Sequence, residues 1–201
     1  MKYQNTALLM IDIQNDFCPE GALAVAGGDE IIPLVNEIQS DYGVLVITQD
    51  WHPANHSSFA QNHENAEPFS MTKMPYGDQV LWPTHCVQGS DGARLHKDLV
   101  SNNADMIIRK GFRSEIDSYS AFFENDQSTK TGLDGYLRDR GVKDIALCGL
   151  ATDFCVYFSA MDAIKCGFHV KLITQACRAI DMEGSLAHAM DAMKAAGIEI
   201  E

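Results

Sequence analysis

Short apolar runs alternate with stretches of helical periodicity along most of the chain. Five of these runs are short and continuously apolar, which is typical of strands buried on both faces of a parallel sheet. They lie at residues 6–13, 44–49, 106–110, 144–148 and 170–174. The pattern therefore predicts strands that are covered by other elements on both sides.

The stretches between the runs are amphipathic. In residues 30–40, Ile31, Leu34, Val35 and Ile38 fall on one helical face, and Pro33 is tolerated near the helix start. The spacing predicts further helices over residues 131–140, 153–165 and 182–196, and residues 197–200 are expected to add a short edge strand. Strands that alternate with helices predict an α/β fold with a parallel sheet between two helical layers.

Residues 51–94 are the exception, because they show little regular pattern. Loops of this length inside a compact domain are usually functional. This one carries both tryptophans of the chain and four of its histidines: His52, His56, His63 and His85. No composition break divides the 201 residues, so we expect one domain over residues 1–201.

Composition narrows the class of protein. Hydrophobic residues make up 46% of the chain and charged residues 21%, as in ordinary globular proteins. A formal net charge of -13 argues against nucleic acid or an anionic membrane as partner. No secretory signal pattern is visible, and the six cysteines include no Cys-x-x-Cys pair, so reduced thiols in the cytoplasm are expected. The oligomeric state stays open, and a homo-oligomer is compatible with the sequence.

Three chemically different side chains follow predicted strands. Asp12 ends the first apolar run, Lys110 follows the run at 106–108, and Cys155 follows the run at 145–147. The carboxyl ends of strands in an open α/β sheet form its ligand crevice. A carboxylate, an ammonium and a thiol are therefore aimed at one pocket, which favours an enzyme.

Cys155 is expected in the first turn of the helix that begins near Asp153. A helix N-terminus and a nearby ammonium both stabilise a thiolate, and free backbone N–H groups at such a turn can bind an oxyanion. With no histidine in an obvious position, the base would be Asp12. The alternatives are a buried structural cysteine, a turn aspartate at Asp12 and a surface lysine at Lys110.

A second group of residues has the chemistry of metal ligands. Asp50 and His52 are two residues apart, so on extended chain they point to the same side. His85 can supply a third ligand and His56 a fourth. This mixture of oxygen and nitrogen donors suits one divalent ion; we expect zinc first, with iron or manganese as alternatives.

At these residues the sequence resembles the nicotinamidases of the isochorismatase-like cysteine hydrolase superfamily. The matching motifs occur in the family's order and extend over nearly the whole chain. They are DIQNDF at 12–17, DWHP at 50–53, WPTHCVQG at 82–89, KG at 110–111 and GLATDFCV at 149–156.

The resemblance implies a six-stranded parallel sheet flanked by helices, with a catalytic set of Asp12, Lys110 and Cys155. It also implies a cis peptide between Leu150 and Ala151, which would turn the N–H groups of Ala151 and Cys155 toward an oxyanion.

The same resemblance assigns the binding residues. A divalent metal would lie on Asp50, His52 and His85. His56 falls where some relatives bring a further ligand and others rely on water. Phe17, Trp82 and Tyr119 match positions that line the ring pocket.

The activity that the resemblance implies is hydrolysis of nicotinamide to nicotinate and ammonia in NAD salvage, with pyrazinamide as a second substrate. One alternative is another cysteine amidase of the superfamily, acting on a carbamoyl or ureido substrate. The other is a metal- or thiol-based redox sensor without turnover, which leaves Asp12 and Lys110 unexplained.

Overall fold

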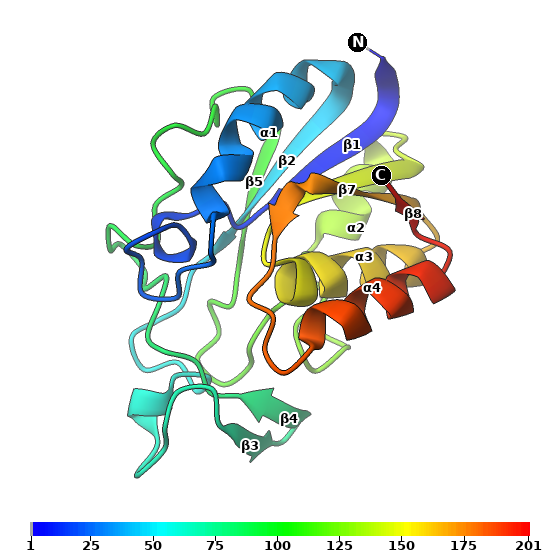
Figure 1. The fold of residues 1–201 in the computed structure, drawn as a ribbon. Helices are drawn as coiled ribbons and strands as arrows, with labels where there is room; N and C mark the ends of the chain where they lie inside the picture. Colours follow the sequence, from blue (N-terminus) through cyan, green and yellow to red (C-terminus); the bar gives the residue numbers. More distant parts are fainter. Residues whose placement is uncertain (1) are drawn as a thin grey trace.

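A computed structural model describes residues 2–201 and contains the expected parallel sheet. Its six strands run parallel in the order β5-β2-β1-β6-β7-β8 (Figure 1). Their bounds are β1 (Tyr3–Ile11), β2 (Tyr42–Asp50), β5 (Met106–Lys110), β6 (Asp144–Leu150), β7 (His169–Arg178) and β8 (Glu199–Ile200).

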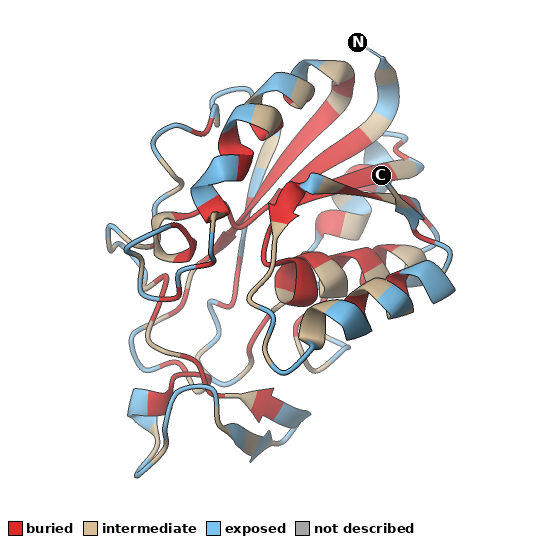
Figure 2. Cartoon of the chain, viewed as in Figure 1, coloured by how far each residue is buried: buried red, intermediate tan, exposed pale blue. Residues whose placement is uncertain are grey.

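Helices flank the sheet, which confirms the predicted α/β architecture. In Figure 1, α1 lies on one side of the sheet, and α3 and α4 pack side by side on the other. The helices are α1 (Ile32–Ile38), α2 (Leu133–Asp139), α3 (Tyr157–Lys165) and α4 (Ser185–Ala195). The central strands β1 and β2 are almost wholly buried toward their carboxyl ends, whereas α4 turns one face outward (Figure 2).

The chain order reverses beside β1, and this reversal positions the site. From β1 the chain crosses to β2 and then β5, whereas from β6 it continues to β7 and β8 on the opposite side. Ligands of open α/β sheets bind outside the carboxyl ends of the strands at such a reversal. Gly149 lets β6 approach β1 there, since a Cβ on it would lie 2.1 Å from the Ile11 carbonyl oxygen.

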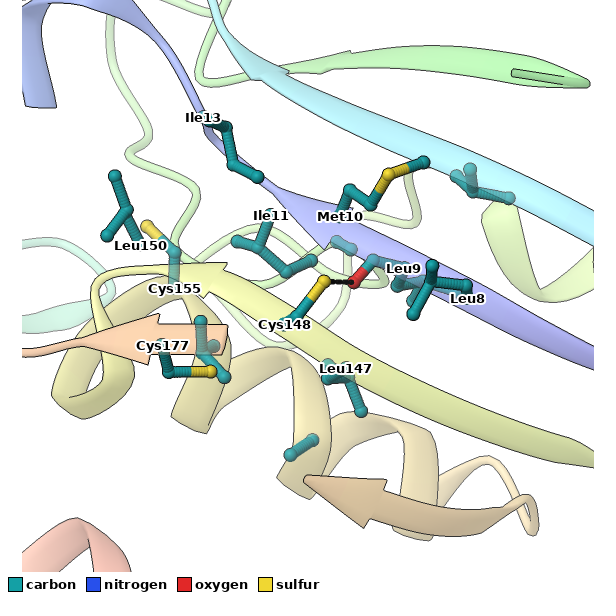
Figure 3. Close-up of a cluster of buried hydrophobic side chains, with 14 of the residues drawn as sticks. Leu8, Leu9, Met10, Ile11, Ile13, Leu147, Cys148, Leu150, Cys155 and Cys177 are labelled. Carbon is teal, nitrogen blue, oxygen red and sulfur yellow. Dashed lines mark hydrogen bonds between the residues drawn. The ribbon is translucent and has the colours of Figure 1, made fainter. Parts of the chain in front are cut away.

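Most cysteines near this junction belong to the core. Cys148 on β6 and Cys177 on β7 are buried members of the hydrophobic core, and the Cys148 thiol lies 3.8 Å from the Leu9 carbonyl oxygen (Figure 3). Cys155 borders the same cluster but stands after the end of β6, in the turn that leads to α3. This placement distinguishes Cys155 from the packing thiols.

Two parts of the chain differ from the sequence prediction. The helix expected over 30–40 is broken into a 3₁₀ turn (Gly28–Ile31), α1 and a second 3₁₀ turn (Gln39–Asp41). The long loop contains a hairpin, β3 (Met71–Met74) and β4 (Gly77–Val80), that was not predicted. Its strands are short, and only one of their eight residues is buried, so they lack an apolar run. Within residues 2–201, no helix is long and apolar enough to cross a membrane.

Candidate active site

The predicted catalytic side chains and Asp50 meet at the carboxyl ends of four neighbouring strands, β5, β2, β1 and β6. Asp12 directly follows β1, Asp50 ends β2, and Lys110 ends β5, where it pairs in register with Asp50. Cys155 lies in a single π-helical turn (Thr152–Val156) between β6 and α3. The π turn replaces the regular first helical turn that we expected.

Lys110 holds this group together. Its ammonium lies 2.8 Å from Asp12 Oδ2, 2.6 Å from Asp50 Oδ1 and 3.4 Å from Cys155 Sγ, and it also donates to the Ser118 carbonyl oxygen. Only 1% of the lysine is exposed. Burial alone would lower the pKa of Lys110, but Asp12 and Asp50 raise it well above the ordinary value. The lysine therefore stays charged and is the counter-charge of both carboxylates.

Asp12 is fixed by a reciprocal contact with β2. Its Oδ1 accepts from the Thr48 hydroxyl at 2.6 Å, and its backbone N–H donates to the same hydroxyl oxygen at 3.0 Å. The residue has a left-handed φ of 47°, which a short polar side chain tolerates. Burial raises the pKa of Asp12, although Lys110 opposes the shift. A carboxylate with a raised pKa is a stronger base, as proton abstraction requires.

The Cys155 thiol differs in one respect from the sequence prediction. Lys110 favours the thiolate as expected, but burial is the larger effect and raises the pKa of Cys155 well above the ordinary value. Asp12 adds to this rise. The resting thiol is therefore protonated, and a proton acceptor beside it is needed for attack. The peptide between Leu150 and Ala151 is cis, as the family resemblance implied.

Asp50, His52 and His85 converge on one point. Asp50 Oδ2 lies 3.1 Å from His52 Nε2 and 3.5 Å from His85 Nε2. The Nδ1 atom of His52 faces the Gly111 carbonyl oxygen at 2.8 Å, and that of His85 faces the Pro83 carbonyl oxygen at 2.8 Å. Carbonyls at Nδ1 select the tautomer that leaves Nε2 free, which is the usual outer support of metal-bound histidines. The three residues therefore fit a divalent metal ion.

Charge also favours a cation at this group. Burial would raise the pKa of Asp50, but Lys110 and His52 hold it well below the ordinary value, so the carboxylate is ionised. All three residues are buried. A carboxylate oxygen with two imidazole nitrogens is a common donor set for zinc.

His56 is placed differently. Its Nδ1 accepts from the Ser58 N–H at 3.2 Å and lies 2.7 Å from the Ser58 hydroxyl, while Nε2 faces the Ile116 carbonyl oxygen at 3.3 Å. Its potential ligand atom is grouped with those of His52 and Asp117, not with Asp50 and His85. Its assignment as a fourth ligand therefore stays a prediction.

A pocket opens onto both groups. Phe17, Trp82 and Tyr119 line it, and the Trp82 indole N–H donates to the Tyr119 hydroxyl at 3.0 Å. Ala151 and Cys155 form part of the same wall. The sequence prediction missed four further lining residues, because no spacing pattern or predicted strand end points to them: Leu23, Asp117, Phe154 and Ile180.

Comparison with known proteins decides the family. Residues 6–201 match the family model described as the isochorismatase domain. The chain belongs to the isochorismatase family. A nicotinamidase from Acinetobacter baylyi is 54% identical over 195 residues, which cover 97% of this chain and 91% of the relative. This isochorismatase-family chain also superposes on a solved nicotinamidase and pyrazinamidase from Acinetobacter baumannii, with a TM-score of 0.98, 50% identity and coverage of 100% and 97% of the two chains.

Two other solved members carry small molecules or ions. A protein from L. infantum in complex with nicotinate is 38% identical, with a TM-score of 0.86 and coverage of 98% of this chain and 92% of its own. A pyrazinamidase from Pyrococcus horikoshii in complex with zinc is 37% identical, with a TM-score of 0.79 and coverage of 98% of both chains. The fold of this family member is therefore shared with proteins that bind a pyridine carboxylate or a metal.

Proposed function

We propose that this family member is a nicotinamidase that hydrolyses nicotinamide to nicotinate and ammonia, with pyrazinamide as a second substrate. The observation that carries the proposal is the contact of the Lys110 ammonium with both Asp12 and Cys155, because Cys155 lines an aromatic pocket. The high identity to nicotinamidases supports the substrate class.

Cys155 is the proposed nucleophile. Its sulfur attacks the carboxamide carbon while Asp12 takes the thiol proton, because a thiol with a raised pKa is not ionised beforehand. The tetrahedral oxygen would be held by the backbone N–H groups of Ala151 and Cys155. Asp12 then returns the proton to the amide nitrogen, and ammonia leaves as the thioester forms.

Water completes the reaction. Asp12, ionised again, takes a proton from a water molecule that attacks the thioester carbon, and the Cys155 sulfur leaves and recovers a proton. Lys110 keeps its charge throughout and stabilises the ionised form of Asp12. Nicotinate is released with the thiol regenerated, so no redox partner is consumed.

We propose that Asp50, His52 and His85 hold one divalent ion, with zinc expected first. Phe17, Trp82 and Tyr119 would enclose the aromatic ring. When bound, the ion would supply a Lewis-acid contact for the ring nitrogen, directly or through water, and would orient the ring. A single-domain chain, a cytoplasmic location and a homo-oligomer stay predictions.

Ammonia release from four amides tests this assignment. Under one set of conditions with zinc added, nicotinamide and pyrazinamide should be hydrolysed. Benzamide lacks the ring nitrogen and picolinamide moves it beside the carboxamide, so both should have a lower kcat/KM, because a site built for a polar contact rejects analogues that lack it. A kcat/KM for benzamide equal to that for nicotinamide would contradict the proposed contact between the metal and the ring nitrogen.

A further inference from the structure

The segment that carries the base Asp12 contains two more polar residues without a role in the chemistry above. Gln14 is fully buried, with 0% of its surface exposed. Its amide nitrogen donates to the Asp50 carbonyl oxygen at 2.9 Å and to the Ala93 carbonyl oxygen at 2.9 Å. Its amide oxygen accepts from the Asp50 N–H at 2.7 Å. One side chain therefore holds both backbone polar groups of Asp50.

Asp16 makes a similar contact with the backbone beside His85. Its Oδ2 accepts from the Cys86 N–H at 2.7 Å, and its Oδ1 accepts from the Ala22 N–H at 3.1 Å. The Cys86 nitrogen belongs to the peptide that joins it to His85. The Cys86 carbonyl oxygen in turn accepts from the His52 N–H at 3.0 Å. Cys86 thus connects Asp16 to both histidines, through its N–H in the peptide after His85 and through its carbonyl oxygen at His52.

Cys86 is held in an uncommon backbone conformation. Cys86 has a φ of 46°, in the left-handed region that non-glycine residues seldom adopt. Such a conformation persists only where surrounding contacts enforce it, and strained residues of this kind gather at functional sites. The carboxylate of Asp16 is a contact of this type, because it accepts the Cys86 N–H directly.

The neighbouring loop leaves room for that carboxylate. A Cβ on Gly92 would lie 2.1 Å from Asp16 Oδ2 and 2.3 Å from Oδ1. The Asp16 N–H also donates to the Gly92 carbonyl oxygen at 3.0 Å. Glycine at this position therefore keeps Asp16 directed at the peptide between His85 and Cys86.

We propose that Gln14 and Asp16 are positioning residues for the metal group, which fix the backbone at Asp50 and at Cys86 and so hold Asp50, His52 and His85 in register. The proposal rests on the metal role proposed above. Asp50 Oδ2 lies 3.1 Å from His52 Nε2 and 3.5 Å from His85 Nε2. Small rotations of the backbone at Asp50 or at Cys86 would separate these ligand atoms. The segment that supplies the catalytic base would thus also preset the ion-binding group beside it.

Outer contacts of this kind have a measurable effect on metal binding. Loss of an outer partner of a metal ligand typically weakens metal affinity about 10–100-fold. Asp16→Asn tests the contact with the Cys86 backbone. An amide accepts hydrogen bonds only through its oxygen, whereas the Asp16 carboxylate accepts through both of its oxygens. Gln14→Met tests the contact with the Asp50 backbone, since methionine keeps the shape of the side chain and removes its three hydrogen bonds.

The experiment measures zinc affinity by competition with a chelator. It uses the full-length wild type, Asp16→Asn, Gln14→Met and the control Asp91→Asn. Asp91 lies beside Gly92, with 81% of its side chain exposed and an ion pair to Arg94, so Asp91→Asn controls for loss of one negative charge on the loop that faces Asp16. Thermal unfolding of each metal-free protein gives the fraction folded to which affinity is referred.

We expect the zinc dissociation constant of native Asp16→Asn and Gln14→Met to rise about 10–100-fold, with Asp91→Asn unchanged. Wild-type affinity in both variants, with zinc bound by the wild type, would overturn this inference alone. A loss that only follows the unfolded fraction would overturn it as well, because the residues would then be merely structural. If one variant does not fold, the other decides. A wild type that binds no zinc would refute the proposed metal role, and the inference with it.

Discussion

Replacing Lys110 by methionine should destabilise the protein through its charges more than through its packing. Methionine keeps most of the apolar stem but removes the ammonium that lies 2.8 Å from Asp12 and 2.6 Å from Asp50. At an effective dielectric constant of about 20, each pair carries about 6 kcal/mol of Coulomb attraction, much of which offsets desolvation. Removal of one partner from a buried pair typically costs about 3–5 kcal/mol. That is a large part of the roughly 5–15 kcal/mol by which a domain is stable.

The loss of unfolding free energy in Lys110→Met should become smaller as the pH falls. Without the ammonium, Asp12 and Asp50 face each other with raised pKa values in the folded state. The folded variant then binds more protons than its unfolded chain, so its stability relative to wild type rises as pH falls from about 7 to about 5. In wild type, the lowered pKa of Asp50 gives stability that is present above the ordinary carboxyl pKa and is lost only at lower pH.

Urea unfolding at both pH values, with a chelator present, measures this. Lys110→Met should lose about 3–5 kcal/mol near pH 7 and less near pH 5. The double variant Lys110→Met/Asp12→Asn should recover part of the loss, since one buried negative charge is gone. A loss below about 1 kcal/mol without pH dependence, the size of an exposed pair, would refute the assignment of Lys110 as the buried counter-charge.

Three further outcomes follow from the site. Asp12→Asn should lower kcat by at least about 10²-fold, because an amide cannot accept the thiol proton; near-normal turnover would show that the base lies elsewhere. The kcat/KM of zinc-saturated wild type should fall on acidification, with a midpoint above the ordinary aspartate pKa of 3.8, because burial raises the pKa of Asp12. A midpoint at or below 3.8 would contradict that rise. Elemental analysis should find about one zinc per wild-type chain, most of it lost in His85→Ala; full occupancy there would exclude His85 as a ligand.

The sequence predicted the sheet and most of the site because both depend on local patterns. Buried strands appear as continuous apolar runs, and a charged residue directly after such a run must find a partner, as Asp12 and Lys110 do. The remaining features depend on tertiary contacts. The hairpin of β3 and β4 has a single buried strand residue and no apolar run, and Ile180 reaches the pocket from a loop after β7.

The state of the Cys155 thiol shows the same limit. A neighbouring lysine can be inferred from strand order, and it does favour the thiolate. The depth of burial cannot be inferred in that way, and burial decides the direction of the pKa shift at Cys155. The contacts of Gln14 and Asp16 were also beyond the sequence, because their partners lie 36 and 70 residues away.

Ammonia release from nicotinamide by wild type and Cys155→Ala tests the central claim most directly. Both proteins are compared at equal concentration with zinc present, and near-UV circular dichroism checks that the variant is folded. The account predicts steady release of ammonia and nicotinate by wild type and none above background by Cys155→Ala. Substantial turnover by the folded variant, or none by wild type, would contradict hydrolysis of nicotinamide through a Cys155 thioester.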